Sequence, residues 1–85
     1  GHFVYVSDKK MDLEKIMSIF DELPNDIIRA KGFVITEEGS FLLNYVFGRF
    51  DYEEFDAKRT ELVFIGRNIG KYEEEIRSKL MECEI

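Results

Sequence analysis

The chain has 85 residues, 18 of them acidic and 12 basic, and carries a formal net charge of −6 at pH 7. This charge opposes non-specific binding to nucleic acid or to anionic membranes, because long-range repulsion slows approach. One cysteine and one histidine exclude an internal disulfide and a structural zinc site.

The sequence predicts a single cytoplasmic domain that spans residues 1–85. Its length is that of one small domain, and a hydrophobic content of 45% is ample for a globular core. It contains no apolar run of about 18 residues and no recognisable signal peptide or lipidation motif. Because the first residue is Gly1 and not methionine, we expect a domain excised from a longer protein.

The first two predicted elements are a strand and a helix. Residues 3–7 are rich in β-forming side chains, which is typical of a strand. Asp12 is a good N-cap, and apolar residues recur after it at helical spacing until Pro24 ends the pattern. The predicted apolar stripe of this helix is Leu13, Ile16, Met17, Phe20 and Leu23.

Residues 26–36 predict a second strand with two different faces. One face is small and apolar, so a helix can lie close to it; its members are Ile28, Ala30, Gly32 and Val34. The other face mixes large apolar groups with two cations; its members are Ile27, Arg29, Lys31, Phe33 and Ile35. We expect the cations either to meet another molecule or, for Arg29, to pair with Glu61 across strands.

A hairpin is predicted to follow the second strand. Gly39 lies in a turn, and the almost wholly apolar run 41–50 predicts the returning strand. Gly48 inside this run indicates a bulge or a close backbone approach. Residues 51–58 predict an acidic loop that leaves the hairpin.

Residues 60–67 predict the last strand, and Asn68 is a candidate cap for a final helix. The predicted inward stripe of that helix is Ile69, Tyr72, Ile76, Leu80 and Cys83. Strand glycines Gly32 and Gly66 are expected where a helix crosses close to the sheet.

The predicted fold is a two-layer α+β domain of order βαβββα, with a four-stranded sheet and two helices on one face. We expect the last three strands to form a meander and the first strand to join at an edge. The first crossover is right-handed if its two strands run parallel.

Two helices cannot cover both faces of an apolar sheet, so the free face is expected to be an interaction surface. We expect Leu43 on this face, and its candidate contact residues are Arg29, Lys31, Phe33, Tyr45, Phe47, Arg49 and Arg67. A domain–domain or homodimer contact would use such a patch, and so would a site for a small molecule or an oligonucleotide.

No stretch of the sequence carries a recognisable active site. Residues 66–72 resemble a Walker A loop, but three residues separate the glycines instead of four, and Tyr72 replaces the magnesium-binding Ser or Thr. Cys83 lies on an apolar stripe, where an inert buried thiol is expected, and His2 is distant in sequence. We predict no catalytic, metal-binding or cofactor-binding residues, and therefore no enzymatic activity in this chain.

Lys31-Gly32-Phe33 matches the start of the RNP1 motif of RNA-recognition domains. The next residues, Val34-Ile35-Thr36, lack the further small and aromatic residues of that motif, and the predicted element order differs from βαββαβ. We therefore expect neither a nucleic-acid partner nor a membrane partner.

Two blocks of the sequence together resemble the CobW C-terminal domain. The first is Arg29-Ala30-Lys31-Gly32-Phe33, preceded by Leu23-Pro24 and an Ile-Ile pair. The second is Glu61-Leu62-Val63-Phe64-Ile65-Gly66, followed by Arg67-Asn68 and a helix that ends near a cysteine. The chain departs from the commoner continuation of the first block, with Val34 and Ile35 and no tryptophan.

This resemblance implies a module that follows the GTPase domain in CobW-type metallochaperones, which help to deliver metals to client proteins or to cobalamin synthesis. The nucleotide site and the Cys-x-Cys-Cys metal motif of such proteins belong to the GTPase domain. The implied partners are that GTPase domain, a metalloprotein client or a second copy. The alternative is a free-standing regulatory ligand-binding domain of ferredoxin-like outline.

Overall fold

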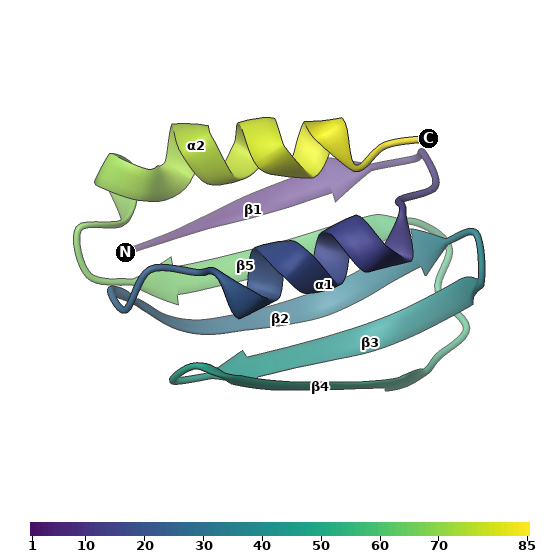
Figure 1. The fold of residues 1–85 in the computed structure, drawn as a ribbon, viewed down its shortest axis with the longest axis horizontal. Helices are drawn as coiled ribbons and strands as arrows, with labels where there is room; N and C mark the ends of the chain where they lie inside the picture. Colours follow the sequence, from purple (N-terminus) through teal and green to yellow (C-terminus); the bar gives the residue numbers. More distant parts are fainter.

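The computed structural model describes residues 1–85 as one five-stranded antiparallel sheet with two helices packed on one face (Figure 1). The predicted α+β class and the placement of both helices are confirmed, but the predicted count of four strands is wrong. The elements are β1 (His2–Ser7), α1 (Leu13–Asp21), β2 (Ile27–Thr36), β3 (Gly39–Val46), β4 (Arg49–Glu54), β5 (Thr60–Gly66) and α2 (Ile69–Glu82).

The strand order in the sheet is β1-β5-β2-β3-β4, and every neighbouring pair is antiparallel. The meander therefore consists of β2, β3 and β4. The chain then returns, and β5 lies between β1 and β2, so the predicted meander of the last three strands is wrong. β1 lies at an edge, as predicted, and runs parallel to β2 across β5.

The fifth strand exists because the apolar run 41–50 is divided by a tight turn. Phe47 and Gly48 both have positive φ, at 48° and 83°, and the turn lets Val46 pair with Arg49. Positive φ at both central residues is the requirement of a type I′ two-residue hairpin turn. Gly48 thus lies in a turn and not in a bulge. Half of the predicted acidic loop, residues 51–54, belongs to the edge strand β4.

The predicted caps are confirmed at α1 and only partly at α2. The Asp12 carboxylate accepts a hydrogen bond from the backbone N–H of Lys15 at 3.0 Å. The Glu37 carboxylate, from the β2–β3 turn, accepts from the N–H of Leu13 at 3.0 Å. Asn68 precedes α2 with φ of 51°, but its side chain makes no capping hydrogen bond. The helix N-terminus at α1 is therefore tied to the sheet through Glu37.

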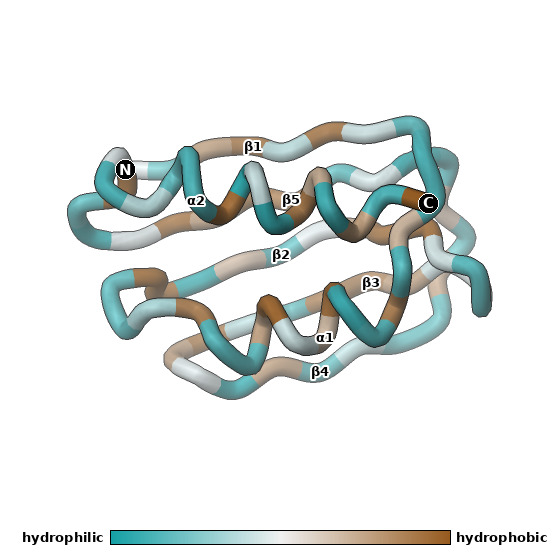
Figure 2. Tube along the Cα trace, turned by 45° about the horizontal axis from the view of Figure 1, so that its top comes forward, coloured by the Kyte–Doolittle hydropathy of each residue, from teal (hydrophilic) through white to brown (hydrophobic).

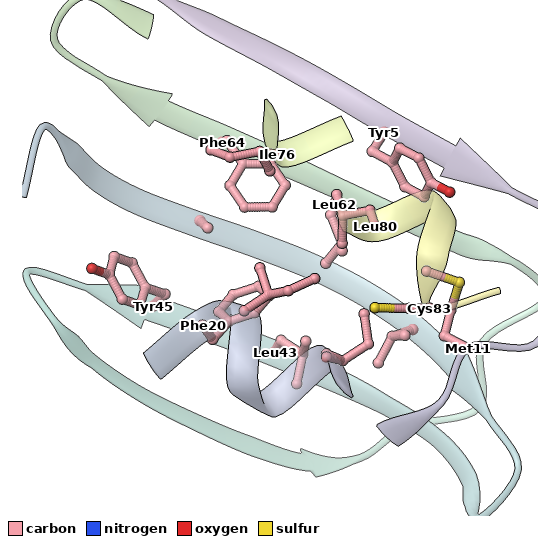
Figure 3. Packing of buried hydrophobic residues seen from close by; sticks show 14 of the residues in the cluster. Tyr5, Met11, Phe20, Leu43, Tyr45, Leu62, Phe64, Ile76, Leu80 and Cys83 are labelled. Carbon is pink, nitrogen blue, oxygen red and sulfur yellow. The ribbon is translucent and has the colours of Figure 1, made fainter. Parts of the chain in front are cut away.

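The core fills the space between the sheet and the two helices. Phe20 of α1 lies at its centre, with ring centroids 6.0 Å from those of Tyr45 and Phe64 and 5.6 Å from that of Phe50. Ile76 and Leu80 of α2 close the other half of the layer (Figure 3). Along both helices apolar residues alternate with hydrophilic ones, as expected for helices that bury one face (Figure 2).

Close backbone packing within the sheet explains both strand glycines. A Cβ atom on Gly32 would lie 1.9 Å from the carbonyl oxygen of Glu61, and one on Gly66 would lie 2.3 Å from that of Asp26. Glu61 belongs to β5, which pairs with β2, and Asp26 directly precedes β2. The expectation that these glycines accommodate a crossing helix is therefore wrong.

Candidate interaction surface

The sheet face that points away from the helices is named here the outer face. Strand register and the alternation of burial define its members, because directly paired residues point to the same side. They are His2, Val4, Val6, Arg29, Lys31, Phe33, Ile35, Ser40, Leu42, Asn44, Val46, Arg49, Asp51, Glu53, Glu61, Val63 and Ile65. No helix of the chain covers this face (Figure 1).

Cross-strand rows organise the outer face. The middle row runs from β1 to β4 through Val4, Val63, Lys31, Asn44 and Asp51. β2 is the central strand of the five, and this row is the middle of the three that span all of them. Lys31 therefore occupies the centre of the outer face.

An open hollow of about 380 Å³ surrounds this centre. Its walls are mostly apolar, and the outward side chains that line it are Arg29, Lys31, Phe33, Leu42, Val63 and Ile65. Ile65 is 43% exposed although it lies in a strand of the sheet interior. The hollow offers apolar area with two cations among the side chains that line it.

Both cations of β2 lack an acidic partner. Neither Arg29 nor Lys31 lies within 4.0 Å of a carboxylate, whereas four other cations of the chain do. Register places Arg29 opposite Ile65, and Glu61 opposite Phe33. The expected pairing of Arg29 with Glu61 is therefore wrong, because Glu61 is held by Arg59 at 3.0 Å.

One end of the outer face is partly covered by the β4–β5 connection. The ring of Phe55 packs against that of Phe33 at a tilt of 31°, with centroids 4.9 Å apart. Arg59 donates to Glu61 from the same connection. This covering stops at Phe33, so the centre of the face stays open.

Tyr45 and Leu43 do not lie on the outer face. Tyr45 is only 2% exposed and meets Phe20 edge-on beneath α1, and Leu43 is fully buried in the same layer. Their predicted placement on the free face is wrong. Ile27 is also buried on the helix side, because a register shift between Ile27 and Arg29 reverses the side-chain alternation there.

The remaining predicted contact residues gather at the end of the sheet that carries the β3–β4 turn. Phe47 is 72% exposed at the turn, and Arg49 begins β4 beside it. Arg67 follows β5 and lines a hollow together with Phe47. Its guanidinium lies 3.6 Å from the Asp26 carboxylate. The roles of these residues stay predictions.

Asp26 has a second partner in α2. The hydroxyl of Tyr72 donates to Asp26 at 2.8 Å, and this hydrogen bond is the main cause that raises the pKa of Tyr72 above its ordinary value. The Asp26 carboxylate thus ties the residue before β2 to α2, and it also pairs with Arg67 at the surface.

Sequence reasoning missed several apolar members of the outer face. Val4 and Val6 alternate with the buried residues of β1, and Val63 and Ile65 alternate with those of β5. For β3, Asn44 was the available signal. A polar side chain in an apolar strand favours the uncovered side, which would have placed Leu42 outward and Leu43 inward.

No group of three or more His, Cys, Asp or Glu side chains is placed to hold a metal ion. Cys83 is buried at the C-terminal end of α2, and burial raises the pKa of its thiol to about 11. None of the helices is long and apolar enough to span a membrane.

Residues 1–84 match the family model described as "Cobalamin synthesis protein cobW C-terminal domain". Two solved structures share the fold over 100% of this chain, each with a TM-score of 0.80. One is a Zn(II)-bound YjiA GTPase from E. coli, at 23% identity, and the other is a Zn(II)-bound triple mutant of YjiA GTPase, at 21%. The chain spans 30% of the length of each. None of the curated proteins matches it.

Proposed function

Because the chain belongs to the CobW C-terminal domain family, we propose that it is a non-catalytic interaction and regulatory domain of a CobW-like, GTP-dependent metallochaperone. It acts in metal delivery or cobalamin synthesis through protein–protein contacts. Its partners are the GTPase domain of the parent protein, a metalloprotein client, or both. The chain itself supplies no nucleotide site and no cofactor.

The observation that carries this proposal is the uncovered outer face. Both helices pack on the opposite side of the sheet, while Val4, Val63, Ile65 and Leu42 form apolar area on this side. Large apolar patches on the surface of a small domain mark protein interaction sites more often than chance. A docked partner would remove this area from water, at roughly 25 cal/mol for each Å² of apolar surface.

Regulation follows if docking differs between nucleotide states. A partner that binds the outer face better in one state of the GTPase shifts the equilibrium toward that state. The domain then acts as a coupling element between the nucleotide site and a client, without chemistry of its own.

The experiment is a methyl NMR titration of this chain with the GTPase domain of the same parent protein, loaded with GDP or with a non-hydrolysable GTP analogue. We expect the largest shifts at Val63 and Ile65, with affinities that differ between the two nucleotides. Ile65→Asp should weaken binding, while Met81→Asp on the exposed side of α2 should not. Shifts confined to α2 would contradict the proposal.

The second candidate function is that of a regulatory ligand-binding domain. The specific observation in its favour is the hollow of about 380 Å³ on the outer face, with cations beside apolar walls. The hollow lies on an open sheet surface, whereas most small-molecule sites enclose their ligand. Saturable shifts around Phe33 with an organic anion, and none with the GTPase domain, would favour this candidate.

A further inference from the structure

Lys31 occupies the centre of the outer face with no carboxylate within 4.0 Å. The acidic side chains on the same face do not pair with Lys31. Glu61 is engaged by Arg59, and Asp51 lies two strands away, about 10 Å across the sheet. A partner that covers this face takes the ammonium group out of water with no internal compensation.

A second polar group at the centre is also unsatisfied. Asn44 lies directly opposite Lys31 on β3, and its side-chain oxygen is buried without a hydrogen-bond partner. An acceptor beside an unpaired ammonium strengthens the polar character of an otherwise apolar patch. A wholly apolar partner would bury the Lys31 ammonium group without a partner and would leave the already buried Asn44 oxygen unsatisfied, at a cost that apolar contact must overcome.

A second copy of the chain is a poor occupant of this face. In a two-fold symmetric pairing, contacts made at the centre are made by the same residue of each copy. Any two-fold contact centred on the outer face thus brings two Lys31 ammonium groups together. Like charges in a desolvated contact repel, and no carboxylate of either copy lies at the centre to separate them.

We propose that the outer face docks a different protein surface, one that presents an Asp or Glu carboxylate to Lys31 from within an apolar patch. This inference rests on the proposed function and specifies the chemistry of its partner. Arg29, on the same strand and the same face, adds a second unpaired cation about 7 Å away. The partner's apolar side chains fill the hollow between Leu42 and Ile65.

The test is carbodiimide cross-linking of the full-length protein that carries this domain, followed by mass spectrometry. The reagent joins a lysine amine to a carboxylate in contact with it, with loss of water. We expect a linked peptide between Lys31 and an acidic residue outside residues 1–85. Lys31→Arg keeps the charge but cannot form this amide, so it should lose the cross-link and keep docking within about threefold.

Lys31→Met removes the charge and keeps the length of the side chain. It should lower the affinity of docking about tenfold or more, because a charged hydrogen bond is lost. A cross-link from Lys31 to a second copy, or unchanged docking of Lys31→Met, would overturn the inference. Side-chain oxidation of Ile65 separates the two levels of failure. If Ile65 is protected in the full-length protein but Lys31 forms no cross-link, the proposed function stands and the carboxylate partner is wrong. If Ile65 is unprotected, both are wrong.

Discussion

A Cβ atom on Gly32 would lie 1.9 Å from the backbone carbonyl oxygen of Glu61 on the adjacent strand. Backbone atoms of the inner strands of a sheet cannot move aside as a flexible side chain can. Gly32→Ala must therefore shift β2 against β5, and its φ of 153° adds strain. We expect a loss of about 3 kcal/mol in the free energy of unfolding, measured by urea denaturation.

Gly70→Ala is the matched control. Nothing lies within 4 Å of a Cβ atom there, and the residue is in the first turn of α2. The substitution should raise the free energy of unfolding by about 0.5 kcal/mol, because alanine is the better helix former. Equal stability of the two variants would contradict the close packing of β2 on β5.

The contribution of α2 to the core is testable at Leu80. This side chain is fully buried in the core between the helices and the sheet, so Leu80→Ala leaves a cavity and should cost about 3 kcal/mol in the free energy of unfolding. The neighbouring Met81 is 62% exposed, and Met81→Ala should change stability by less than about 0.5 kcal/mol. Calorimetric unfolding of both variants measures the difference, and equal melting temperatures would show that α2 is not docked as described.

The thiol of Cys83 is expected to be inert in the folded chain. Burial is the main cause that raises its pKa to about 11, so little reactive thiolate exists at pH 8. Labelling with an aromatic disulfide reagent should proceed at a rate limited by unfolding, and should become fast in denaturant. Fast labelling of the native chain at pH 8 would contradict the burial of this residue.

The C-terminus gives a prediction of pH dependence. The Tyr5 hydroxyl donates to the Glu84 carboxylate, which is the main cause that holds the pKa of Glu84 below its ordinary value of 4.5. A folded-state pKa below the unfolded value contributes stability above pH 4.5, and this contribution is lost as the pH falls through the folded value. Burial, together with the same bond, raises the pKa of Tyr5, so its hydroxyl stays a donor at neutral pH.

Tyr5→Phe keeps the buried ring and removes the donor. At pH 7 the variant should be less stable by about 1 kcal/mol, and the difference from the unmodified chain should shrink below about pH 4. Chemical denaturation at a series of pH values measures this difference. A difference that grows as the pH falls would contradict the assigned direction.

The sequence predicted both helices and most of their inward stripes, because apolar spacing and the Asp12 cap are local signals, but it omitted the buried Ile19 and placed Leu23, which follows α1, in the helix. It failed at the β3–β4 turn for a physical reason. Phe47-Gly48 lacks the Asn-Gly or Asp-Gly pair that usually marks a two-residue turn, and the acids of β4 are depleted in strands. An edge strand tolerates such charges, since one side of it faces water.

The position of β5 between β1 and β2 could not be read from the sequence. Strand order depends on contacts between residues far apart in the chain, and every strand of this sheet except β4 carries apolar residues on both faces. For the candidate site, the cations Arg29 and Lys31 were identified, but Val63 and Ile65 were not. Their outward placement follows from register, which local patterns specify weakly when both faces are apolar.

The most direct test of the outer face is hydroxyl-radical footprinting of the full-length protein against this chain alone. Oxidation of Phe33, Val63 and Ile65 should fall several-fold in the full-length protein, because a docked partner excludes water from these side chains. Met81, on the exposed side of α2, should be oxidised equally in both. Unchanged oxidation of all three outer-face residues would contradict docking at this surface.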